Sequence, residues 1–184
     1  MQKLLILFLL SSIYVVYGAN PYKYSSNTNC QRFENTVYLL NVTFPKKTSF
    51  NAALRLLPNY LFDELFSIAN GNNAAEIGVN ISLSNRVGYY KCLSKNHMRL
   101  TGLGFLYENP DVSFLADNGA VVIHDYDFKF SNNDRRLKGQ VQFAAFPIGT
   151  NPFTTKEDPV NEGDVGEVTG QLLKFKEYFD LSDT

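Results

Sequence analysis

Apolar and polar residues alternate strictly in several short segments of this chain, and this alternation constrains the fold more than any other feature. In residues 76–84, EIGVNISLS, every second position is Ile, Val or Leu. A period of two places successive side chains on opposite faces of a β-strand. The chain also contains 15 Phe and 11 Tyr residues among many Asn, Ser and Thr, and aromatic residues favour strands. Strands are therefore expected near residues 35–44, 75–84, 87–94, 99–107, 111–116, 120–130, 137–146 and 165–180.

Two turns are expected between these strands. The Asn-Gly pair at residues 118–119 lies between alternating apolar runs and supplies the positive φ angles that a type I′ hairpin turn needs. A two-residue loop at this position would place Ser113 directly opposite His124. The Asn-Asn pair at residues 132–133, followed by charged residues, indicates a second and looser hairpin.

A different periodicity occupies residues 50–68. Apolar residues recur there at spacings of three and four, which is the pattern of one helical face. Thr48 or Ser49 is a natural N-cap for such a helix, and the Asn-Gly pair at residues 70–71 is a natural stop. Pro58 lies inside the stripe and predicts two short helices or one kinked helix. The stripe consists of Phe50, Leu54, Leu57, Leu61, Leu65 and Ile68.

The order of a strand, a helical segment and then many antiparallel strands predicts an α+β fold. In such a fold a curved antiparallel β-sheet carries one or two helices packed on one face. An all-β barrel or sandwich is the alternative. The expected organisation is a signal peptide over residues 1–18, an extended N-terminal arm over residues 19–34 and a single α+β domain over residues 35–184.

Residues 1–18 have the layout of a secretory signal peptide, with one lysine, an apolar run over residues 4–10 and small side chains at Val16 and Gly18. The apolar run is shorter than the ~20 residues that a bilayer span needs. We therefore expect cleavage after Gly18 rather than a membrane anchor. The mature protein is expected to be secreted and extracellular, with no membrane span.

Two further features fit secretion. The two cysteines, Cys30 and Cys92, are expected to form one disulfide in an oxidising compartment, because two cysteines without neighbouring histidines make a poor metal site. Asn41 and Asn80 each begin an Asn-X-Ser/Thr sequon. The alternation places both on the outer face of a strand, where a glycan must point. Both are expected to be glycosylated if the source is a eukaryote.

Charge and motif content exclude several classes of function. The formal net charge is −1 at pH 7 and lysines and arginines do not cluster, so a nucleic-acid partner is not expected. We expect no metal and no cofactor. His97 is expected in a loop between polar residues. The acidic segment at residues 157–164 lacks the spacing of an EF-hand; it is expected to be an ordinary surface loop, with calcium binding left open.

The segment AVVIHDYDFKF contains one of the two histidines of the chain, directly beside an aspartate. Strand parity places His124 on one face with Tyr126, and Asp125 on the other face with Asp127, so His124 and Asp125 cannot form a catalytic dyad. Ser113, across the predicted hairpin, would be within hydrogen-bonding reach of His124. His124 is then either a pocket base, with Ser113 and Tyr126 nearby, or a buried histidine satisfied by a hydroxyl or a carbonyl. The two aspartates are expected to face solvent.

The leading functional hypothesis is a secreted glycoprotein that acts as a binding module without catalysis, because no catalytic motif such as G-x-S-x-G is present. Its partner would be a small apolar ligand or an extracellular protein. The rival is a small cofactor-independent isomerase, cyclase or dehydratase with His124 as the base. A third hypothesis is a structural or host-directed factor that works through the polar loop at residues 147–164. The aromatic residues expected to line a ligand site are Tyr107, Phe114, Tyr126, Phe128 and Phe143.

Overall fold

The computed structural model describes residues 28–45, 49–66 and 82–174. Within these ranges, nine strands form one antiparallel sheet, accompanied by three short 3-10 helices. The 3-10 helices are η1 (Thr28–Phe33), η2 (Pro58–Tyr60) and η5 (Ser113–Leu115). The strands are β1 (Thr36–Thr43), β2 (Ser49–Leu56), β3 (Leu61–Phe66), β4 (Arg86–Ser94), β5 (His97–Leu106), β6 (Ala120–Ser131), β7 (Arg136–Pro147), β8 (Asn161–Glu162) and β9 (Gly166–Leu172).

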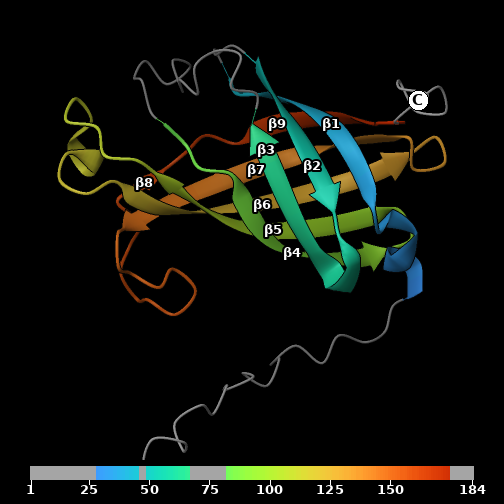
Figure 1. Ribbon diagram of the computed structural model, residues 1–184, viewed down its shortest axis with the longest axis horizontal. Coiled ribbons are helices and arrows are strands. Elements are labelled where there is room, and N and C mark those ends of the chain that lie inside the picture. The colour runs from blue at the N-terminus through green and yellow to red at the C-terminus, as the bar shows by residue number, and fades with distance from the viewer. Residues whose placement is uncertain (1–27, 46–48, 67–81, 175–184) are drawn as a thin grey trace, which may run out of the picture.

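The sheet closes on itself as an antiparallel barrel (Figure 1). Strands β1 to β7 each pair with the next strand in the chain, and β9 then lies between β7 and β1. Gly170 of β9 faces Leu137 of β7 on one side and Leu40 of β1 on the other. The two-residue strand β8 pairs only with β7 and is not part of the ring. The predicted α+β fold is therefore wrong, and its alternative, an all-β barrel, describes the chain.

The helices predicted around Pro58 are wrong, because this part of the chain forms β2 and β3. Leu54 of β2 points into the barrel and is 1% exposed, whereas Leu61 and Leu65 of β3 point outward and are 41% and 50% exposed. The described residues of the apolar stripe thus come from both faces of two strands and, at Leu57, from the turn between them; Ile68 lies outside the described residues. Two inward positions, Phe62 and Glu64, lie between Leu61 and Leu65 in β3, and because the second is a glutamate it interrupts the apolar alternation of a strand.

Most of the other predicted strands are confirmed. The five strands β1, β4, β5, β6 and β7 begin and end within two residues of the expected positions. Strand β9 is confirmed from Gly166 to Leu172, and the predicted continuation lies largely outside the described residues. The strand predicted over residues 111–116 is wrong, because the Asn109 side chain accepts a hydrogen bond from the Asp111 N–H at 2.9 Å and turns the chain into η5.

The Asn-Gly pair at residues 118–119 does not close a two-residue hairpin. Leu106 at the end of β5 pairs with Ala120 at the start of β6, so residues 107–119 form one long connection. The prediction failed because η5 occupies the segment before the pair, and β5 is the strand that aligns with β6 along its length. The looser hairpin predicted at residues 132–133 is confirmed, since both asparagines have positive φ in the turn between β6 and β7.

The two ends of the barrel differ (Figure 1). At one, the closed end, η1 packs against the barrel, and Cys30 forms the predicted disulfide with Cys92 of β4. The Phe33 ring of η1 lies 4.4 Å from the Phe130 ring of β6, measured between centroids. At the opposite, loop-bearing end, long connections join β3 to β4, β5 to β6 and β7 to β9. A site carried by loops on this scaffold would lie there.

Several predictions concern residues outside the described ranges. They include the signal peptide over residues 1–18, the sequon at Asn80 and most of the strand predicted over residues 75–84. The described part of the predicted arm is residues 28–34; residues 28–33 form a 3-10 helix held by the disulfide rather than an extended segment. Among the described residues, no helix has the length and apolar character needed to cross a membrane.

Candidate functional site

Three polar side chains meet inside the barrel, because strand parity points them inward; we call Glu64, Arg86 and Tyr126 the polar cluster. Arg86 Nη1 of β4 lies 2.9 Å from Glu64 Oε2 of β3, and the two residues are 5% and 0% exposed. Tyr126 of β6 donates its hydroxyl hydrogen to the same carboxylate oxygen at 2.6 Å and accepts a hydrogen bond from Arg86. Each member therefore has a partner within the cluster, as a buried charged or polar group requires. The other carboxylate oxygen of Glu64, Oε1, is buried and bonds to no described residue.

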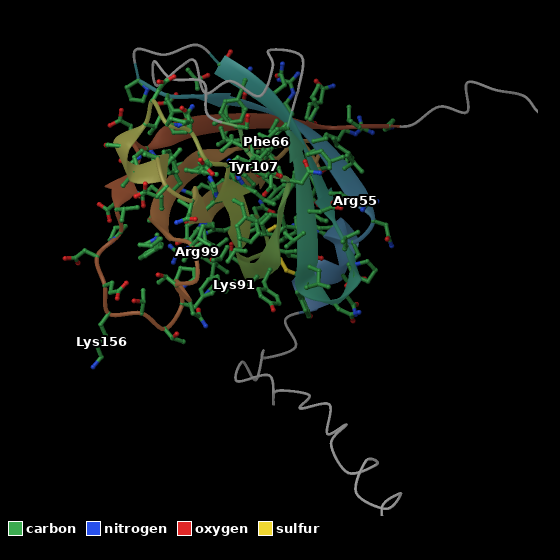
Figure 2. The ribbon with its side chains drawn as sticks, turned by 60° about the vertical axis from the view of Figure 1, so that its left-hand side comes forward. Arg55, Phe66, Lys91, Arg99, Tyr107 and Lys156 are labelled. Atoms are coloured by element: carbon green, nitrogen blue, oxygen red, sulfur yellow. A yellow bond between two sulfur atoms is a disulfide. The ribbon has the colours of Figure 1, made fainter. Side chains whose placement is uncertain are left out.

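Glycines of β5 make room for Arg86 and for Phe62, whose ring packs against Tyr126. A Cβ atom at Gly104 would lie 3.1 Å from Arg86 Cγ, and one at Gly102 would lie 2.7 Å from the Phe62 ring. The guanidinium carbon of Arg86 also lies 4.0 Å from the centroid of the Phe66 ring, a cation–π contact. Phe66 is the last residue of β3, which places this contact at the loop-bearing end (Figure 2).

A cavity of about 70 Å³ adjoins the polar cluster on the side of the loop-bearing end. Its polar lining residues are Arg86, Tyr126, His124 and, from β8, Asn161. Phe114, from the connection between β5 and β6, belongs to a small apolar cluster at this end and contributes to the lining. The remaining wall is mostly apolar and includes Val42, Phe44, Phe50, Leu106, Val122 and Phe143.

His124 lies on the cavity wall and has no hydrogen-bonding partner among the described residues. It pairs with Gly102 of β5 and Phe143 of β7, and not with Ser113, which lies in η5. The His124 and Phe143 ring centroids are 5.8 Å apart. Nδ1 of His124 is buried and bonds to no described residue. Burial, and secondly the positive charge of Arg86, lower the pKa of His124 well below its usual value, so the imidazole is neutral at neutral pH.

Tyr126 is also uncharged. Burial raises the pKa of the Tyr126 phenol well above its usual value, because the anion would be desolvated inside the barrel. The hydroxyl therefore stays protonated at neutral pH and keeps the hydrogen that it donates to Glu64.

The predicted parity of β6 is confirmed, and it separates His124 from Asp125. On the outer face, Asp125 accepts a hydrogen bond from the Thr101 hydroxyl, and Asp127 Oδ1 lies 2.8 Å from His97 Nε2. His97 is the first residue of β5, so the prediction that it lies in a loop is wrong. In the part of the chain that the structure describes, no group of three or more His, Cys, Asp or Glu side chains is arranged to hold a metal ion.

The aromatic residues predicted to line a ligand site lie in three different places. Phe114, Tyr126 and Phe143 lie on the cavity wall. Phe128 is fully buried among the core residues that extend to the closed end. Tyr107 is exposed beyond the end of β5 (Figure 2). The cavity therefore brings together three of the five residues, and their role in binding stays a prediction.

Sequence reasoning missed two members of the polar cluster, Glu64 and Arg86. A signal was present, since a glutamate at an inward position of an alternating strand needs a buried partner. That signal becomes visible only when LFDELF is assigned to a strand, and the helical spacing of its leucines concealed this.

No protein-family model matches this chain, and no curated protein or solved structure is similar to it. The barrel architecture alone does not define a function. The functional argument therefore rests on the cavity and the side chains around it.

Proposed function

We propose that this protein is a non-catalytic binding protein that holds a small, largely apolar molecule at the loop-bearing end of its barrel. The cavity carries the proposal: most of its lining is apolar, and its polar lining residues are Arg86, Tyr126, His124 and Asn161. An apolar wall with a few converging polar groups is the usual form of a small-molecule site. An eight-stranded barrel is just wide enough to fill with side chains or to hold one small ligand.

The rival enzyme gains support from one observation, which is that the cavity touches His124. A general base, however, works best with a pKa near the operating pH and with a neighbour that orients it. The pKa of His124 is lowered by burial, and no described residue bonds to its Nδ1. We therefore propose binding as the function and keep proton abstraction by His124 as the second candidate.

A single fluorophore can test binding directly, because the chain contains no tryptophan. Phe114→Trp places the reporter on the cavity wall. Titration of this variant with n-hexanol should shift the tryptophan emission and reach saturation. Phe105→Trp is the matched control, since Phe105 lies on the outer face of β5 and is 47% exposed; its emission should not saturate.

A second variant tests the location of the probe. Val122 is buried and lines the cavity, so Val122→Phe in the Phe114→Trp background should fill the space and remove the saturable response. Overpacking of this kind costs about 1–3 kcal/mol, and a far-ultraviolet spectrum checks that the variant stays folded. Equal, non-saturating responses from both reporters, or a response that survives Val122→Phe, would contradict the proposal.

We further propose that the protein is secreted and glycosylated at its sequons, Asn41 and Asn80. The disulfide supports an oxidising compartment. Asn41 lies between the buried residues Leu40 and Val42 of β1, which places its side chain on the outer face. Mass spectrometry of protein collected from the medium of eukaryotic cells should show cleavage after Gly18 and a mass loss on glycan removal. Retention in the cells with an unmodified mass would contradict this proposal.

A further inference from the structure

We infer that the molecule bound in the cavity is uncharged and presents a hydroxyl group to His124 and Arg86. The inference rests on the proposed function and adds the chemical class of the ligand, which is an apolar alcohol or phenol. Three observations carry it: the balance of charge around the cavity, the unused hydrogen-bonding capacity of two lining residues, and the apolar wall toward the loop-bearing end.

The charges around the cavity cancel. The carboxylate of Glu64 and the guanidinium of Arg86 are 2.9 Å apart and nearly fully buried, and neither His124 nor Tyr126 adds a charge. A ligand carboxylate would compete with Glu64 for Arg86 and would carry an uncompensated negative charge into a buried site. A ligand ammonium would meet the positive charge of Arg86. Removing either ion from water is unfavourable without a free counter-charge, so the site favours a neutral ligand.

Two lining residues have unused hydrogen-bonding capacity. Nδ1 of His124 has no partner among the described residues. Arg86 donates to Glu64 and Tyr126 through Nη1, and within the described chain its Nε and Nη2 donate to no other side chain or carbonyl. Arg86 packs over Gly104, two residues along β5 from the Gly102 that pairs with His124, so the two groups adjoin the same space.

A hydroxyl group satisfies both residues. Its hydrogen can be donated to the imidazole nitrogen of His124, and its oxygen can accept a hydrogen bond from Arg86. An ether oxygen can only accept, so it leaves unpaired an imidazole nitrogen that carries no proton. A buried polar atom left without a partner weakens binding, so the hydroxyl should be preferred over an ether of the same size.

The size of the cavity determines where the rest of the ligand lies. About 70 Å³ accommodates the hydroxyl and a few carbon atoms. A longer molecule must extend toward the loop-bearing end, where Leu83, Leu106 and Phe114 line the cavity. These three side chains are apolar and Asn161 is the one further polar lining residue, so the remainder of the ligand is expected to be mainly hydrocarbon.

Four probes of similar length separate these requirements: n-hexanol, its isomer methyl pentyl ether, hexanoate and hexylammonium. Binding is measured at neutral pH from amide chemical shifts of the isotopically labelled wild-type protein. Hexanol should shift amides of β5 and β6 next to the cavity and bind about 3- to 10-fold more tightly than the ether, the effect of one net hydrogen bond. Hexanoate and hexylammonium should bind at least about tenfold more weakly than hexanol.

The variant His124→Phe tests whether His124 causes the preference for hexanol over the ether. Phenylalanine preserves a ring beside Phe143 but cannot accept a hydrogen bond. It should bind hexanol and the ether equally. An ether or hexanoate that binds wild-type protein as tightly as hexanol overturns the inference and leaves the proposed function standing. A hexanol preference that persists in His124→Phe overturns the role of His124. Failure of all four probes to shift cavity amides overturns the proposed function together with the inference. The comparison of probes in wild-type protein depends on no variant.

Discussion

Replacing one member of the buried Glu64–Arg86 pair should destabilise the barrel more than replacing both. Glu64→Leu leaves the guanidinium of Arg86 charged and buried, and it removes the acceptor of the Tyr126 hydroxyl. Arg86→Leu leaves a carboxylate inside the barrel without its counter-charge. The double variant removes both charges at once and extends the apolar core around Tyr126.

The contacts of Glu64, Arg86 and Tyr126 determine how much unfolding free energy each variant should lose. Breaking a buried ion pair by removing one partner costs about 3–5 kcal/mol of unfolding free energy, whereas replacing the whole pair by apolar residues is often nearly neutral. In the double variant the main cost is the Tyr126 hydroxyl left unpaired, about 1–3 kcal/mol. With a urea m-value of about 2 kcal/mol/M, each single variant should lower the urea midpoint by about 1.5–2.5 M. The double variant should lower it by about 0.5–1.5 M.

Urea unfolding of the wild-type protein, the two single variants and the double variant measures these shifts. The adjacent residue supplies a matched control. Asp63 points outward from β3, and its Oδ1 accepts a hydrogen bond from Arg55 Nε of β2 at 3.0 Å; Figure 2 labels Arg55 on the outside of the barrel. Because Arg55 is exposed, leucine variants of this outer pair should change the midpoint little and additively. A Glu64→Leu/Arg86→Leu protein less stable than either single variant would refute the reasoning.

Three further predictions concern the disulfide and pH. Reducing the Cys30–Cys92 bridge, whose partners are 62 residues apart, should lower the unfolding free energy by about 4 kcal/mol, seen as a lower thermal midpoint in reductant; an unchanged midpoint would contradict this. Below about pH 6.5 the unfolding free energy should fall, because the pKa of His124 is lowered in the folded protein and the ring gains a proton only on unfolding. Urea titrations should show this fall in wild-type protein and a smaller one in His124→Phe. Above about pH 10 the unfolding free energy should also fall. Burial raises the pKa of Tyr38 and Tyr90 in the folded state, so the unfolded chain loses these protons first. An unfolding free energy that does not change with pH in this range would contradict this.

The sequence was sufficient to predict which side chains of β6 point inward, but it was not sufficient to predict which strand pairs with β6. His124 points inward and Asp125 outward in any sheet, because parity depends only on position along one strand. To predict which residue lies opposite His124, one must know which strand pairs with β6. The Asn-Gly pair suggested the segment that contains Ser113, but β6 aligns with β5 instead. The disulfide needed only two cysteines and an oxidising compartment, and it was predicted correctly.

The polar cluster depends on contacts between residues distant in sequence, and therefore it was missed. Glu64 by itself resembles a solvent-facing residue in a helix. Its role follows only when Arg86, on the next strand after a long connection, lies beside it with Tyr126. The closure of the sheet also depends on residues distant in sequence, since nothing local in residues 166–172 indicates pairing with β1 near the start of the described chain.

The position of β9 has a consequence for how a newly made chain becomes a barrel. This strand pairs with both β1 and β7, and it is the last strand in the described part of the chain. Until it has been synthesised, both neighbours have backbone N–H and C=O groups without partners, which is the condition that promotes pairing with other chains. The Cys30–Cys92 bridge requires only the first half of the sequence. It can form on the nascent chain and fix η1 to β4 while the ring is still open, so covalent closure can precede completion of the sheet.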